Sequence, residues 1–160
     1  MKRKQFIPVI LALAMSVMLW AQEAPKLELR ISESKVNMTR EEESGETPVS
    51  YKPGDSILYV IDAVNTGNGV MNNPVVTDPV PTGVVYVPLS AEGEDADISF
   101  SINNGISYQS WPPTYTILDN DGKSIVKEAT PGMVTHIRWE IKDPLQVNEQ
   151  KKLEFMVEVK

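Results

Sequence analysis

The side chains that could carry chemistry in this chain are few and widely spaced. His136 is the single histidine and there is no cysteine, so thiol nucleophiles, thiolate metal sites and disulfides are excluded. His136 is expected on the outward face of a strand beside Arg138, where carboxylates or waters would be the remaining metal ligands. The sequence contains no Gly-x-Ser-x-Gly elbow, the motif that presents a nucleophilic serine in many hydrolases. We therefore expect no catalytic residues, no metal ligands and no cofactor.

Carboxylates gather in two segments of the chain. The acidic segment Glu92–Asp97 offers oxygen ligands of the kind that a hard cation takes, although a solvated loop has the same composition. Asp119–Gly122 is similar to the start of a calcium loop, but the distal glutamate of such a loop is expected at position 130, which is Thr130. We interpret Asp119–Gly122 as a turn. Acid–base work would need carboxyls of these two segments to converge: Glu92, Asp95, Asp119 and Asp121.

Three aromatic residues surround a rigid pair of prolines, Pro112 and Pro113. Tyr108, Trp111 and Tyr115 form a tentative binding surface on which a sugar or a peptide could stack. Aromatic rings also close the ends of β-sandwiches, which is the alternative interpretation of Trp111.

The elements that position these residues are β-strands. The segment Ser56–Val64 is rich in β-branched and aromatic residues, and turn signals precede it at Lys52–Asp55 and follow it at Asn65–Gly69. Ile57 and Ile61 share one face of this strand with Tyr59 and Ala63. The pattern predicts a central strand of an antiparallel sandwich.

Other segments alternate in the same way. Lys26–Ser34 predicts a half-buried strand with Leu27, Leu29 and Ile31 on one face. Val134–Ile141 places Trp139 in the core, and Lys152–Lys160 directs Leu153, Phe155 and Val157 inward. Between the first two strands, Met38–Pro48 lacks an apolar face. It is interpreted as a solvated connection without a helix, in which Glu41–Glu43 are exposed.

The strands and turns together predict an all-β protein. Strands of five to nine residues separated by turns, without an amphipathic helix, are typical of an antiparallel β-sandwich. We expect about 7–9 strands in a single domain that spans residues 22–160. The hydrophobic content of 41% is enough for a core.

The first 21 residues predict export. Lys2-Arg3-Lys4 is followed by an apolar run from Phe6 to Trp20, which is the layout of a cleavable signal peptide, residues 1–21. The run is short for a membrane span, so no span is expected after cleavage. Three of the 15 basic side chains lie in this segment, so the rest of the chain carries 12 basic against 22 acidic side chains. A net acidic surface makes nucleic acid a poor partner.

Five motifs in a fixed order are similar to a known family. They are the segments Pro53–Gly67, Val76–Tyr86, Phe100–Gly105, Ile137–Leu145 and Leu153–Val159. Together they resemble the repeat domain of bacterial cell-envelope and surface proteins filed as domain of unknown function eleven. The resemblance implies an immunoglobulin-like sandwich and brings no catalytic residues. The family's members are often tandem copies, whereas this chain holds one copy.

Two functions from different classes follow as expectations. The first is an exported, non-enzymatic module in the periplasm, in the cell envelope or outside the cell, which contacts another envelope or secreted protein through sheet edges and loops. The second is a module that binds a glycan or a cation through the Trp111 loop or the acidic loops. A buried Trp111 would weaken the second expectation.

Overall fold

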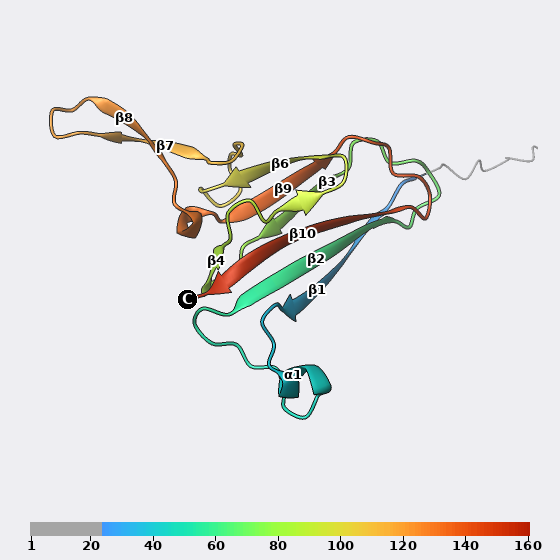
Figure 1. The fold of residues 1–160 in the computed structure, drawn as a ribbon. Coiled ribbons are helices and arrows are strands. Elements are labelled where there is room, and N and C mark those ends of the chain that lie inside the picture. The colour runs from blue at the N-terminus through green and yellow to red at the C-terminus, as the bar shows by residue number, and fades with distance from the viewer. Residues whose placement is uncertain (1–23) are drawn as a thin grey trace, which may run out of the picture.

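The structure is a computed structural model that describes residues 24–160, and the expected signal peptide lies outside the described residues. Within this part of the chain, every strand pairing is antiparallel. Figure 1 shows two facing sheets and a hairpin that extends beyond them. The expected all-β antiparallel sandwich is confirmed.

The larger sheet has the strand order β1-β2-β10-β4, and β5 also pairs with β10. As expected, the strand after the Lys52–Asp55 turn is central, because β2 lies between β1 and β10 (Figure 1). The bounds of these strands are β1 Leu27–Lys35, β2 Ser56–Asn65, β4 Val84–Tyr86, β5 Glu92–Gly93 and β10 Gln150–Val159.

The smaller sheet has the order β3-β9-β6, and a separate two-stranded unit pairs β7 with β8. The remaining bounds are β3 Val75–Pro79, β6 Ala96–Ser101, β7 Thr114–Leu118, β8 Ser124–Glu128, β9 His136–Ile141 and the short 3-10 helix η1 Pro131–Met133. The described residues thus form ten strands rather than 7–9. Part of the difference is β5, a two-residue pairing too short to be visible in a hydrophobic pattern.

The core lies between the two facing sheets. Trp139 is fully buried on β9, and its indole Nε1 donates a hydrogen bond to the backbone oxygen of Glu92 at 3.0 Å. Phe155 on β10 lies beside it, with ring centroids 6.0 Å apart. The inward faces predicted for β9 and β10 are confirmed by the fully or almost fully buried residues Ile137, Trp139, Ile141, Leu153, Phe155 and Val157.

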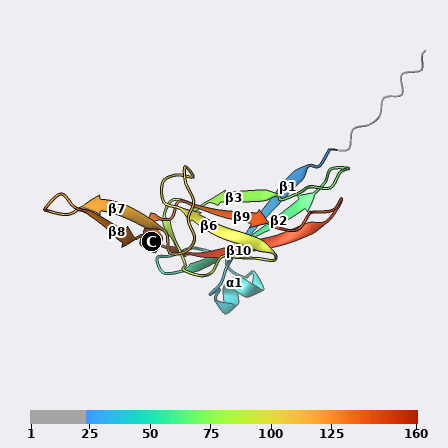
Figure 2. The same ribbon diagram turned by 90° about the horizontal axis from the view of Figure 1, so that it is seen from above.

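The burial expected for β1 is wrong at two positions. Leu29 and Ile31 are 41% and 54% exposed, although their partners across β2, Ala63 and Ile61, are fully buried. Alternation correctly places Leu29 and Ile31 on the inner face. However, β1 is the outermost strand of the larger sheet, and the three-stranded facing sheet leaves this face uncovered (Figure 2).

The solvated connection predicted over Met38–Pro48 contains a helix, α1 (Arg40–Ser44). A capping box starts it: the Thr39 hydroxyl accepts from the Glu42 amide, and the Glu42 carboxylate accepts from the Thr39 amide. Gly45 ends it with a φ of 76°. The expectation of an exposed charge run is also wrong for Glu42, whose side chain is 7% exposed. Hydrogen bonds at both ends of α1 therefore stabilise a short helix that has no apolar face to pack against the core.

Candidate interaction surfaces

A projecting hairpin is the most unusual feature of the fold. We call Thr114–Glu128 the hairpin arm; it consists of β7, β8 and the turn between them. Both views show it reaching beyond the sandwich (Figures 1 and 2). Leu118 and Val126 are 68% and 66% exposed, and Ile125 is exposed on the opposite face. A two-stranded hairpin that packs on nothing is only marginally stable in water, so the exposed apolar residues on both faces make the arm a candidate contact surface.

The base of the arm is fastened to the sandwich by specific hydrogen bonds. The Ala129 amide donates to the Pro113 oxygen at 2.8 Å, which closes the hairpin below its first pair. The Gln109 side chain donates from Nε2 to the Thr114 oxygen at 2.8 Å and accepts from the Thr114 amide at 3.0 Å. Pro113 itself is fully buried. The arm is therefore oriented at its root and exposed beyond it.

The three aromatic residues proposed as a binding surface lie in three different settings. Trp111 packs edge-on against Tyr86 and Phe100, with ring centroids 5.4 Å and 5.3 Å apart, at the margin of the core. Tyr108 lies under the guanidinium of Arg138, whose Cζ is 3.7 Å from the ring centroid.

Tyr115 belongs to the arm, where it pairs with Lys127 across the hairpin. The Trp111 ring thus helps to hold the arm's root in place, and its packing weakens the case for a stacking platform. Of the three residues, Tyr115 is the one that shares an element with the exposed apolar residues of the arm.

The tip of the arm is a turn, as predicted for Asp119–Gly122. The Oδ1 atom of Asp119 accepts from the amides of Asp121 and Lys123 at 2.9 Å and 2.7 Å. The Asp119 amide donates to the Lys123 oxygen at 2.9 Å. One carboxylate oxygen of the suspected calcium loop is thus occupied in closing the hairpin.

The acidic segment Glu92–Asp97 is largely matched by lysines. Lys151 Nζ lies 3.5 Å from Asp95 and 3.9 Å from Glu94, and Lys142 Nζ lies 2.7 Å from Asp97. The Asp97 carboxylate raises the pKa of Lys142, chiefly through a side-chain hydrogen bond. Nearby ammonium groups compete with a cation for these oxygens, so the segment is a poor site for Ca²⁺.

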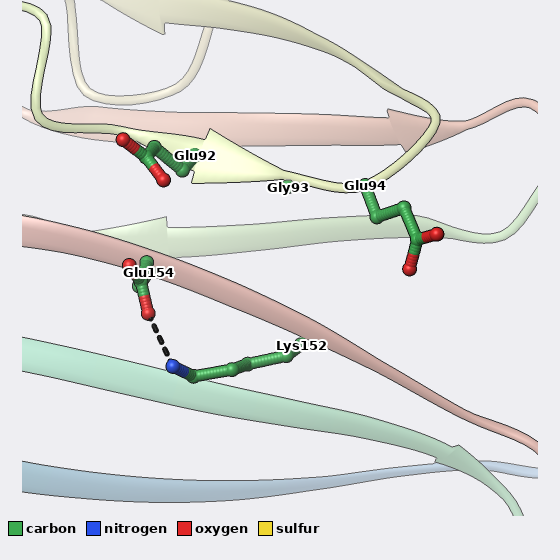
Figure 3. Close-up of a pocket in the computed structure, with 5 residues that line it drawn as sticks. All are labelled: Glu92, Gly93, Glu94, Lys152 and Glu154. Atoms are coloured by element: carbon green, nitrogen blue, oxygen red, sulfur yellow. Dashed lines mark ion pairs between the residues drawn. The ribbon is translucent and has the colours of Figure 1, made fainter.

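A surface pocket of 240 Å³ borders this segment (Figure 3). Glu92, Gly93 and Glu94 line one side, and Lys152 and Glu154 of β10 line the other. Lys152 Nζ and a Glu154 carboxylate oxygen are 2.6 Å apart. The volume is below the ~300–1,000 Å³ of typical small-molecule sites, and the one lysine that lines the pocket is paired with Glu154.

The four carboxylates that could have formed an acid–base pair are not in one place. Glu92 and Asp95 lie on β5 and the turn that leads into β6, whereas Asp119 and Asp121 lie at the tip of the arm. In Figure 1 the tip is on the far side of the molecule from the start of β6.

The single histidine, His136, contacts the side chain of the preceding threonine. His136 Nδ1 lies 3.2 Å from the Thr135 hydroxyl. Among residues 24–160, no group of three or more His, Asp or Glu side chains is arranged to hold a metal ion.

Among the same residues, no helix has the length and apolar character needed to cross a bilayer.

An ion-pair cluster that the sequence analysis missed holds the end of β1. Lys35 Nζ lies 3.0 Å from Asp55 and 3.3 Å from both carboxylate oxygens of Glu42, and it donates to the Ser50 oxygen at 3.0 Å. Backbone amides of Thr39 and Ser50, followed by Lys35, hold the pKa of Glu42 at about 2. The capping-box pattern Thr39-x-x-Glu42 was the available sequence signal.

The hairpin arm was also missed as a surface, although the turn at its tip was predicted from the sequence. Comparison with models of protein families, with curated proteins and with solved structures finds no match for this chain.

Proposed function

We propose that the chain is an exported, non-enzymatic β-sandwich module of the periplasm, the cell envelope or the extracellular space, which acts by contacting another protein through the hairpin arm. The observation that carries this proposal is the exposure of Leu118 and Val126 on a hairpin whose root is firmly hydrogen-bonded. A rigid root with a projecting hairpin that exposes apolar side chains presents a surface without first having to order it, which lowers the entropy cost of binding.

Chemistry of the arm favours a protein partner over a glycan or a cation. Its exposed apolar side chains, Leu118, Ile125 and Val126, are aliphatic, and aliphatic residues contribute to binding by being removed from water in a complementary groove. Glycan binding would require stacking rings, but Trp111 packs against Tyr86 and Phe100. Cation binding would require unpaired carboxylates, but Asp95 and Asp97 of the acidic segment pair with lysines. These contacts favour the arm over the alternative module.

The export part of the proposal rests on the signal-peptide layout, and the envelope address rests on the motif resemblance. Both are properties of the sequence. They describe where the arm would meet its partner and leave the partner's identity to experiment.

The test uses a photo-crosslinking residue at Val126 of the arm and, as a matched control, at Val75 of β3, which is 50% exposed but lies outside the arm. Crosslinking in the native host should give one adduct specific to position 126. The purified partner should then bind the Val75→Ser variant like the wild type and the Leu118→Ser/Val126→Ser variant at least about tenfold more weakly. Equal adducts at both positions, or unchanged binding by the double variant, would overturn the proposal.

A further inference from the structure

The outer edge of β1 presents unpaired backbone groups. At its two ends, the Thr66 amide donates to the Lys26 oxygen and the Val36 amide donates to the Ser56 oxygen, each at 2.8 Å. Residues of an antiparallel strand alternate between facing their partner strand and facing away. The even-numbered residues of β1 therefore bond to β2, and the amides and carbonyls of Leu27, Leu29, Ile31 and Glu33 point to the open edge.

This edge lacks two features that commonly prevent strand pairing, a bulge and a proline. The β1–β2 register runs without a bulge over nine consecutive pairs, and β1 contains no proline. Its inner face carries the exposed Leu29 and Ile31. Lys35, a charge that could repel a neighbour, is held in its ion pairs and is 7% exposed. A long, regular and partly apolar edge strand is a template for another strand.

The sequence of β1 selects a second copy of itself as that strand. In an antiparallel pair centred on Leu29, Leu29 lies opposite Leu29 of the other copy, and Leu27 lies opposite Ile31. On the outer face the same register places Glu28 opposite Arg30 twice, by symmetry. All the residues that would exchange backbone hydrogen bonds in this register are odd-numbered, which are the ones that point to the open edge.

Neighbouring registers are worse by the same criteria. A pair centred on Arg30 places two guanidinium groups directly opposite each other, and a pair centred on Ile31 places Leu29 opposite Glu33. Like charges directly opposite in a sheet are destabilising. α1 lies beyond the far end of β1 from Leu27 (Figure 1), so it leaves the pairing segment open within the described residues.

We propose that two copies of this chain pair along β1, antiparallel and centred on Leu29, so that their larger sheets become one continuous sheet. The apolar side chains Leu27, Leu29 and Ile31 of both copies then cover one another on the inner face, and Glu28–Arg30 pairs form across the outer face. This inference is independent of the hairpin arm, which lies on the opposite side of the sandwich from β1 in Figure 1.

The test exchanges charges across the two-fold axis. Glu28 and Arg30 pair within one chain at 2.9 Å and are largely exposed, so substitutions here should leave the fold intact, which circular dichroism checks. Glu28→Arg places two guanidinium groups opposite each other across the axis, and Arg30→Glu places two carboxylates opposite each other, so each variant should be monomeric. When they are mixed, the two variants are complementary at both positions and should form a heterodimer.

Sedimentation velocity gives the readout. The wild type should show a concentration-dependent dimer, each variant alone a monomer, and the equimolar mixture a restored dimer. A wild type that stays monomeric up to about 1 mM, or folded variants whose mixture stays monomeric while the wild type dimerises, would overturn the Leu29-centred pairing.

Discussion

Trp139 connects the two sheets through both packing and a hydrogen bond. It is fully buried, it lies beside Phe155, and its indole bonds to the backbone of β5. Its ring therefore fills volume and also satisfies a backbone oxygen of a strand in the opposite sheet. A smaller apolar side chain would do neither.

Replacing Trp139 by alanine should lower the free energy of unfolding by about 3–5 kcal/mol, because a large aromatic side chain leaves a cavity and an unpaired carbonyl. Urea unfolding followed by circular dichroism measures the loss. The control is Leu118→Ala on the arm, which should change stability by less than about 0.5 kcal/mol, since its side chain is exposed. Equal losses in the two variants would mean that the packing described for Trp139 is wrong.

Glu42 provides a pH-dependent contribution to stability. Its pKa is about 2 in the folded chain, below the value of about 4.3 of an unfolded glutamate. A lowered pKa in the folded state means that the ionised form is favoured there, so the contribution is complete above pH ~4.3 and is lost as the pH falls toward 2.

We therefore expect Glu42→Gln to lower the melting temperature at pH 7, and the gap to the wild type to narrow between pH ~5 and pH ~2. Thermal melts across this range measure it. Glu43→Gln, in the same helix and exposed, is the matched control and should follow the wild type. A gap that is constant over the whole range would exclude the charge of Glu42 as its cause.

At the scale of the elements, the hairpin arm behaves as an appendage with a separate root. Odd-numbered pairs of the hairpin exchange backbone bonds, as the Pro113–Ala129 and Asp119–Lys123 bonds show. The chain could therefore be cut back to the Tyr115–Lys127 pair and closed by a two-residue Asn-Gly turn without disturbing the root.

Excising Thr116–Val126 in this way should shift the melting temperature by less than about 3 °C, because the removed residues project beyond the sandwich. The same variant should lose binding to the protein that crosslinks at Val126. Gln109→Ala, which keeps the arm but removes the hydrogen bonds to Thr114, should be the more destabilised of the two. A large loss on excision would mean that the arm is an integral part of the core.

At the scale of the whole molecule, the proposed dimer would affect how the hairpin arm binds its partner. The sandwich carries the hairpin arm on one side and an open sheet edge on the other (Figure 1). Pairing along β1 would place two arms on one particle, so that two weak contacts would act together and raise the apparent affinity for a repeated or dimeric partner.

If the protein is exported, cleavage of the signal peptide gives the mature chain a defined N-terminus. Mass spectrometry of protein from the native host should find an N-terminus at or near Gln22, because a basic start followed by a short apolar run directs cleavage after a small residue. Leu13→Asp interrupts the apolar run and should leave the precursor uncleaved. An intact Met1 on the wild-type protein in cytoplasmic fractions would contradict export.

The sequence alone was enough to determine the inward faces of the long strands. In β9 and β10, a period of two places Trp139, Phe155 and their neighbours inward, and the structure confirms it. The turns at Lys52–Asp55 and Asp119–Gly122 were equally visible, because proline, glycine and aspartate specify turn conformations through local geometry. Such features depend on residues close together in the chain, so a single sequence contains them.

Tertiary structure decided which of these faces are covered. Leu29 and Ile31 have the same pattern as Ile57 and Ile61, but the smaller sheet ends before it reaches β1. The capping-box residues of α1 can be recognised in the sequence. The burial of Glu42 against Lys35, however, depends on the packing of β1 against the turn that contains Asp55. The hairpin arm likewise has ordinary strand patterns, and its projection from the sandwich depends on contacts at Gln109 and Trp111. Alternation defines the two sides of a strand, but only the packing of distant segments determines which side meets another layer and which is left for a partner.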